Sequence, residues 1–121
     1  MFIINDSFVY ANRLFNILGE NAKILIVGFS RNGKDALLEM AKNPPDLVVL
    51  DIQLPDMDGM EVMRKIKEQH KKTTVIIITN ISESTIREKC KELGAEGFYD
   101  RATEFELAVK KINSLINGKF N

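Results

Sequence analysis

The chain has 121 residues, and its 17 basic and 17 acidic side chains give a formal charge of zero. This balance argues against a non-specific nucleic-acid-binding protein, which needs a basic surplus. The single cysteine, Cys90, excludes an intramolecular disulfide framework and a cysteine-based zinc site. Apolar runs such as residues 75–78 are far shorter than the roughly 20 residues of a membrane-spanning helix.

One domain is expected over residues 1–121, because domains typically contain roughly 100–150 residues. No linker rich in Ser, Gly or Pro divides the chain, and no segment repeats. The N-terminus lacks the basic segment and long apolar stretch of a secretory signal. We therefore expect a cytoplasmic protein that binds neither membranes nor nucleic acid directly.

Short apolar runs alternate with amphipathic segments along the chain. In chain order we expect a strand over 2–4, a helix over 8–18, a strand over 24–27, a helix over 35–41, a strand over 47–50, a helix over 60–69, a strand over 75–78, a helix over 85–93, a strand over 98–99 and a helix over 105–116. The apolar runs do not alternate with polar residues, which is typical of strands buried on both faces of a parallel sheet.

The predicted helices also carry boundary signals. Gly19 and Gly94 are placed to end the first and fourth helices, and Pro44 stops the second. Thr103 and Glu106 have the spacing of a capping box at the start of the last helix.

Five strand–helix units in succession predict an α/β fold with right-handed crossovers. In one small domain they favour a flavodoxin-like, doubly wound sheet of five parallel strands in the order 2-1-3-4-5. The five helices would then cover both faces of this sheet. The chain is too short for an eight-stranded barrel.

Polar side chains follow four of the predicted strands, at the sheet edge where open α/β sheets bind ligands. Asp6 follows the first strand, Asp51 the third, Thr79 the fourth and Arg101 the fifth. Because the first and third strands are neighbours, Asp6 and Asp51 should face one another. Two adjacent carboxylates repel unless a cation lies between them, and Mg²⁺ suits a few oxygen ligands supplemented by waters.

These residue types suit a phosphoryl group. Mg²⁺ and Arg101 would neutralise phosphate oxygens, and the Thr79 hydroxyl would donate a hydrogen bond to one of them. A carboxylate can itself be the nucleophile and form an aspartyl phosphate. Asp51 is the better candidate, because it ends a central strand of the predicted sheet.

The sequence around these residues resembles the receiver domains of bacterial response regulators, the chemotaxis-regulator-like family, over essentially the whole chain. The matching segments are DLVVLDIQLPDMDG (46–59), IIND (3–6), VIIIT (75–79) and GAEGFY (94–99). The resemblance implies that Asp51 is the phosphoacceptor. It also implies that Asp6, Asp51 and the backbone carbonyl of Gln53 bind Mg²⁺.

Two further roles are implied by the resemblance. Thr79 would bond the phosphoryl group and move towards it. Phe98, three residues before Arg101, would be the aromatic side chain that turns inward when the domain switches.

The sequence departs from the family pattern at four positions. Asn5 stands where the family usually has an acid, Arg101 replaces a lysine, Asn80 replaces a small residue, and Ala102 replaces a proline. Two carboxylates and one guanidinium leave a formal charge of −1 at the site, where a third carboxylate would give −2. Mg²⁺ binding should therefore be weaker, with Asn5 acting only through a metal-bound water.

The resemblance implies a two-component response regulator that accepts a phosphoryl group from a histidine kinase, a phosphotransfer protein or a small phosphodonor. Beyond self-catalysed transfer and hydrolysis, it would not be an enzyme. The helix over 85–93, the strand over 98–99 and the last helix would signal to a protein partner, from a monomer or a weak homodimer. If Asn121 ends the whole protein, we expect the signal to leave by a protein contact. If the sequence is part of a longer protein, we expect an effector domain outside it to set the output. The alternative is a degenerate receiver that binds a partner without phosphorylation.

Simpler interpretations of single residues stay open. Asp6 can cap the first helix, Thr79 can be an ordinary strand-end residue, and Arg101 can be a surface ion-pair partner. Phe98 can be part of the core. Cys90 lies on the apolar stripe of its helix and is expected to be a buried, inert thiol.

Overall fold

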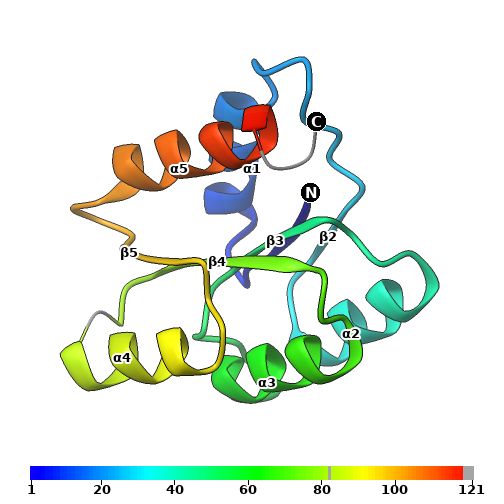
Figure 1. Cartoon of the computed structure of the whole chain (residues 1–121), viewed down its shortest axis with the longest axis vertical. Helices are drawn as coiled ribbons and strands as arrows, with labels where there is room; N and C mark the ends of the chain where they lie inside the picture. Colours follow the sequence, from blue (N-terminus) through cyan, green and yellow to red (C-terminus); the bar gives the residue numbers. More distant parts are fainter. Residues whose placement is uncertain (82, 119–121) are drawn as a thin grey trace.

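The computed structural model describes residues 1–81 and 83–118, in which strands and helices alternate along the chain (Figure 1). In chain order the elements are β1 (Phe2–Ile4), α1 (Phe8–Leu18), β2 (Gly28–Ser30), α2 (Gly33–Lys42), β3 (Leu47–Leu50), α3 (Gly59–Gln69), β4 (Thr74–Thr79), α4 (Ser84–Glu92), β5 (Gly97–Asp100) and α5 (Phe105–Gly118). No helix among these residues is long and apolar enough to cross a bilayer.

The five strands form one parallel sheet in the order β2-β1-β3-β4-β5. In Figure 1, α1 and α5 cover one face of the sheet, and α2, α3 and α4 cover the other. The predicted doubly wound, flavodoxin-like architecture is therefore confirmed. The carboxyl ends of neighbouring strands meet at a single edge, so residues far apart in the sequence come together there.

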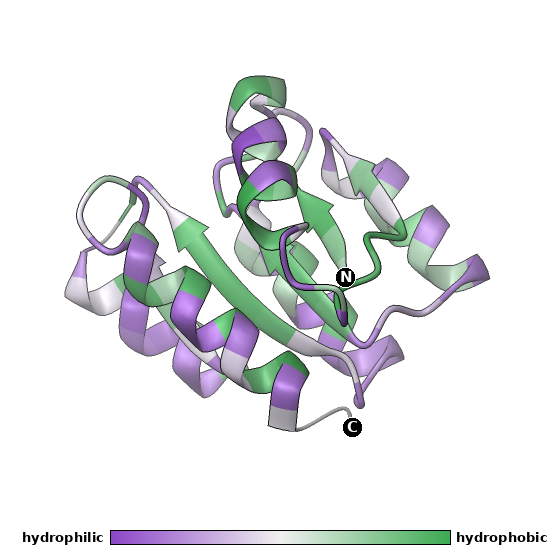
Figure 2. Cartoon of the chain, turned by 90° about the horizontal axis from the view of Figure 1, so that it is seen from above, coloured by the Kyte–Doolittle hydropathy of each residue, from purple (hydrophilic) through white to green (hydrophobic). Residues whose placement is uncertain are grey.

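Two apolar cores lie on opposite faces of the sheet, because successive side chains of a strand point to opposite sides. Val49 and Ile78 pack with α1 and α5, whereas Val48 and Ile77 pack with α2, α3 and α4. Every residue of β3 and β4 is buried, which explains their continuous apolar sequence. Figure 2 shows these apolar strands between helices whose polar sides face outward.

The second strand does not lie where the sequence predicted it. Residues 24–27 were expected to form it, but β2 covers Gly28–Ser30. Pairing with β1 starts at Phe2 and Gly28, so the preceding apolar run lies before the paired segment, with Ile24 and Ile26 packed against the core. The Val27 N–H donates to the Met1 carbonyl, and Leu25 is 75% exposed.

The capping box predicted for the last helix is also wrong. The first turn of α5 closes with the Ala108 N–H donating to the Glu104 carbonyl, so the helix begins one residue later than Thr103 would require as its cap. The Thr103 N–H donates instead to an Asp100 carboxylate oxygen. The signal at the end of α4 is confirmed, since Gly94 has a φ of +104°, a backbone conformation that favours glycine.

The start of α3 depends on a glycine packed against the loop that follows β3. The Gly59 N–H donates to the Ile52 carbonyl at 3.1 Å. A Cβ atom at position 59 would lie 2.2 Å from the Ile52 Cα atom, so a side chain there forces the backbone to move.

Gly59→Ala should lower the free energy of unfolding by about 2 kcal/mol or more, because the clash is with backbone. Gly118→Ala is the matched control, since a Cβ atom there meets no atom within 4 Å. Urea unfolding of both variants measures the difference. Equal midpoints for the two variants would contradict this account of the loop.

Candidate functional site

The Asp51 carboxylate lies at the centre of the carboxyl edge of the sheet. Asp51 follows β3 directly and is only 2% exposed. Its Oδ1 atom accepts two hydrogen bonds, from the Thr79 hydroxyl at 2.8 Å and from the Gln53 N–H at 2.9 Å. A buried carboxylate that accepts a hydroxyl from a neighbouring strand is a candidate reactive group.

A cation faces the other oxygen of the same carboxylate. The Arg101 Nη1 atom lies 3.8 Å from Asp51 Oδ2, and its side chain is 22% exposed. The structure therefore brings together Asp51, Thr79 and Arg101, from the ends of three strands. Arg101 is not a surface ion-pair partner, because its counter-ion is buried.

Asp6 and Asn5 lie at the end of β1, and the structure gives them different surroundings. Asn5 is buried, and its Oδ1 atom accepts the Ser7 N–H at 2.8 Å. Ser7 caps α1 by accepting the Tyr10 N–H, so Asp6 is not the cap of that helix. The Asp6 side chain is exposed and free to face a ligand from solvent.

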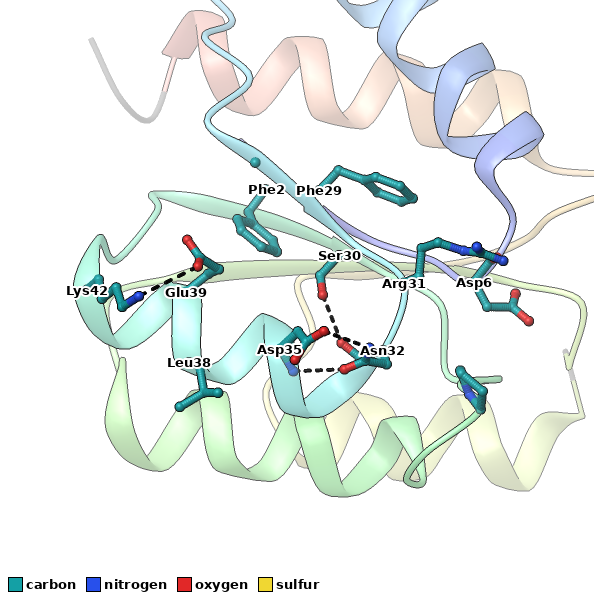
Figure 3. A pocket seen from close by; sticks show the side chains of 12 residues that line it. Phe2, Asp6, Phe29, Ser30, Arg31, Asn32, Asp35, Leu38, Glu39 and Lys42 are labelled. Carbon is teal, nitrogen blue, oxygen red and sulfur yellow. Dashed lines mark hydrogen bonds and ion pairs between the residues drawn. The ribbon is translucent and has the colours of Figure 1, made fainter.

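Figure 3 shows Asp6 at the rim of an open cavity of about 780 Å³ beside β2 and α2. The Arg31 Nε–H donates to the Asp6 backbone carbonyl at 3.1 Å, and both residues line the cavity. Asp51, Thr79 and Arg101 do not line it. The cavity therefore adjoins the Asp51 site and shares Asp6 with it.

Burial raises the pKa of the Asp51 carboxyl above its ordinary value, and the nearby Asp6 charge raises it further. The hydrogen bonds from Gln53 and Thr79 lower the same pKa, and so does the Arg101 guanidinium, but burial is the largest influence. The ionised carboxylate is therefore incompletely compensated by the protein. A bound divalent cation would supply the missing positive charge.

The oxygen atoms at this edge fit such a cation only in part. Among residues 1–81 and 83–118, no cluster of three or more His, Cys, Asp or Glu side chains could hold a metal ion. The Asp6 and Asp51 carboxylates remain, together with the carbonyl of Gln53. Two carboxylates, a carbonyl and several waters suit Mg²⁺, and the missing third acid predicts weak binding.

Two aspartates that the sequence analysis treated only as part of a motif fix the loop after β3. The carboxylate oxygens of Asp56 accept the Gly33 and Lys34 N–H groups at 2.8 and 2.9 Å, at the start of α2. These hydrogen bonds hold the pKa of Asp56 below its usual value. Asp58 caps α3 by accepting the Met60 N–H at 2.9 Å. The loop that carries Gln53 is thereby tied to two helices.

Phe98 is 3% exposed and belongs to the core beneath α2, α3 and α4. Arg87 covers it, with its Cζ atom 4.8 Å from the ring centroid and its Nη1 donating to the Phe98 carbonyl. The Arg87 Nη2 also pairs with Glu104 at 2.8 Å. The role of Arg87 was not predicted from the sequence. Nothing in the residue spacing of α4 indicates that this charged side chain extends over β5.

The raised pKa of Asp51 predicts a stability difference that depends on pH. The folded protein holds the proton of the Asp51 carboxyl more tightly than the unfolded chain does. The contribution of this proton to the free energy of unfolding is therefore largest below the unfolded-state pKa of Asp51, and it is lost as the pH rises through the folded-state pKa. Because an asparagine side chain does not ionise, Asp51→Asn avoids this loss of stability and should raise the free energy of unfolding at pH 7 by about 1 kcal/mol. Urea unfolding should show the difference shrinking below about pH 4. An Asn variant less stable than wild type at pH 7 would contradict the burial argument.

Comparisons with known proteins identify the family of the chain. The family described as "Response regulator receiver domain" matches residues 1–113. The transcriptional regulatory protein YdfI of Bacillus subtilis is 31% identical over 116 residues, which are 96% of this chain and 54% of that protein. A protein-glutamate methylesterase/protein-glutamine glutaminase of Syntrophus aciditrophicus is 39% identical over 87 residues, which are 72% of this chain and 25% of that protein. The chain thus spans about half or less of these curated relatives.

Solved structures show the same fold. The structure of the CheX–CheY–BeF3–Mg complex from Borrelia burgdorferi matches with a TM-score of 0.86 and 25% identity, covering 94% of this chain and 86% of that chain. The signal receiver domain of the response regulator NarL from Mycobacterium tuberculosis matches with a TM-score of 0.85 and 24% identity, covering 97% and 94%. Because the family model covers residues 1–113, the chain belongs to the response regulator receiver domain family.

Proposed function

We propose that this chain, as a single receiver domain, is a phosphorylation-controlled switch of a two-component system, with Asp51 as the phosphoacceptor. The observation that carries the proposal is the convergence of Thr79 and Arg101 on the two oxygens of one buried carboxylate. The donor would be a phosphohistidine of a histidine kinase or phosphotransfer protein, or a small acyl phosphate.

The nucleophile is best assigned to Oδ2 of Asp51. Oδ1 already accepts two hydrogen bonds, whereas the ionic partner of Oδ2 among the described residues is the Arg101 guanidinium. In the transfer, a new P–O bond forms at this oxygen, the P–N bond of the phosphohistidine breaks, and the imidazole leaves with the bonding electron pair. Arg101 pairs with the phosphoryl oxygens, and Thr79 redirects its hydroxyl from the carboxylate to one of them.

Mg²⁺ bound by Asp6, Asp51 and the Gln53 carbonyl would neutralise phosphoryl charge during this step. The residues fit the ion in part, since Asp6 is exposed towards solvent and the protein leaves Asp51 short of positive charge, although a third carboxylate is missing. The solved CheX–CheY–BeF3–Mg²⁺ complex supports this assignment by similarity. Asn5 could contribute only through a water, because its amide oxygen already accepts the Ser7 N–H.

The signal would leave through the surface formed by α4, β5 and α5. Thr79 and Phe98 lie on adjacent strands, two register positions apart, since Ile77 pairs with Phe98 and Thr79 with Asp100. Movement of Thr79 towards a phosphoryl group would be felt along β5 and by Arg87, which bridges Phe98 and Glu104. This is a two-state element biased by a local charge. A protein partner would bind that surface, and the CheX–CheY complex is a solved example of a similar protein with a protein partner.

One observation favours the alternative, a phosphorylation-independent binding module. Arg101 already lies 3.8 Å from Asp51 before any phosphoryl group is present. A guanidinium is always charged and can neutralise the carboxylate permanently. The two proposals differ in whether Asp51 can be labelled.

Asp51→Asn should abolish labelling by acetyl phosphate in the presence of Mg²⁺, because the nucleophilic oxygen is gone. Intact-mass spectrometry measures the added phosphoryl group. Asp35→Asn is the matched control, since Asp35 is an exposed aspartate on α2, and its labelling should equal wild type. Full labelling of the Asp51 variant would refute the assignment, and no labelling of wild type at any donor concentration would favour the alternative.

Two single-charge variants test the metal ligands. Asp6→Asn should raise the Mg²⁺ concentration at half-saturation about tenfold or more, and Asn5→Asp should lower it, because Mg²⁺ affinity follows the number of carboxylate ligands. Amide NMR titrations at residues around Asp51 measure both constants. Unchanged constants in both variants would place the ion elsewhere.

A further inference from the structure

Arg101 contacts two groups at once, the Asp51 carboxylate and the ring of Tyr10. Its Nη1 atom lies 3.8 Å from Asp51 Oδ2. Its Cζ atom lies 3.9 Å from the centroid of the Tyr10 ring, well inside the roughly 6 Å range of a cation–π contact. One flat guanidinium therefore lies against an aromatic ring and points a nitrogen at the carboxylate.

Tyr10 is itself held firmly in α1. The residue is 5% exposed, and its ring makes an edge contact with Phe105 at a centroid distance of 5.8 Å and an angle of 78°. Phe105 is covered in turn by Arg13, whose Cζ atom lies 4.0 Å from the ring. The ring of Tyr10 is thus a fixed surface, and it restricts the conformational freedom of the Arg101 side chain that lies on it.

The Tyr10 ring acts as a neutral aromatic surface and not as a counter-ion. Burial raises the pKa of Tyr10 to about 12, so the phenol keeps its proton at neutral pH. Among the described residues its hydroxyl has no hydrogen-bond partner. The hydroxyl therefore does not explain the contact with Arg101, and the aromatic face does.

We propose that Tyr10 is a positioning residue for Arg101, whose guanidinium it holds over Asp51 so that the free N–H groups meet phosphoryl oxygens. A guanidinium is planar and stacks on aromatic rings, whereas a lysine ammonium is a compact point charge. The aromatic ring thereby allows an arginine at the end of β5 to hold its guanidinium over Asp51. The consequence for phosphorylation rests on the function proposed above, while the hold on Arg101 is a property of the unphosphorylated protein.

The first test measures the pKa of Asp51 by ¹³C NMR in the unphosphorylated protein. Tyr10→Leu should raise this pKa, because Arg101 loses its position, and Tyr10→Phe should leave it unchanged, because the ring remains. In an Arg101→Gln background, Tyr10→Leu should have no effect on the pKa of Asp51. A rise of equal size in that background would show a merely structural role and overturn the proposal, as would a rise in Tyr10→Phe.

The second test measures the rate of labelling by acetyl phosphate. Tyr10→Leu should slow labelling roughly three- to tenfold, the range that a partly desolvated cation–π contact supplies, and Tyr10→Phe should label like wild type. If wild type is not labelled while the pKa coupling is present, the proposed function fails and the positioning of Arg101 stands. If labelling occurs but Tyr10→Leu changes neither the rate nor the pKa, the positioning role fails alone.

Discussion

The buried charge of Asp51 is the constraint on which the rest of the site depends. A carboxylate that is 2% exposed is costly unless donors and cations surround it. The fold supplies a hydroxyl from β4, an N–H from the loop after β3, and a guanidinium from the end of β5. These groups do not fully offset the burial, which leaves a site that attracts further positive charge.

The parallel sheet explains why these groups meet. Strands β3 and β4 are buried along their whole length, and their carboxyl ends are fixed by the packing of helices on both faces. The loop after β3 is then pinned by Asp56 at the start of α2 and by Gly59 against Ile52. The substitution of an arginine at the end of β5 is accommodated by an aromatic residue of α1, from the opposite end of the sequence.

Much of this organisation could be predicted from the sequence, because continuous apolar runs fix β3 and β4 and the strand order then brings Asp51, Thr79 and Arg101 together. The predicted position of the second strand, residues 24–27, was wrong, because an apolar run indicates β propensity but not where its partner strand begins. Tyr10, Arg87 and Asp56 could not be assigned roles from spacing. Each acts across a long sequence separation, through a ring face, a bridging guanidinium or a pair of helix N–H groups.

The central claim is that Asp51 carries a phosphoryl group that moves the α4–β5–α5 surface. An amide NMR titration with Mg²⁺, followed by beryllofluoride as a mimic of the phosphoryl group, tests it most directly. The account predicts that Mg²⁺ shifts residues around Asp6 and Asp51, and that the mimic then shifts Thr79, Phe98 and α5. Resonances that stay in place at saturating concentrations of both reagents would contradict it and favour a constitutive binding module.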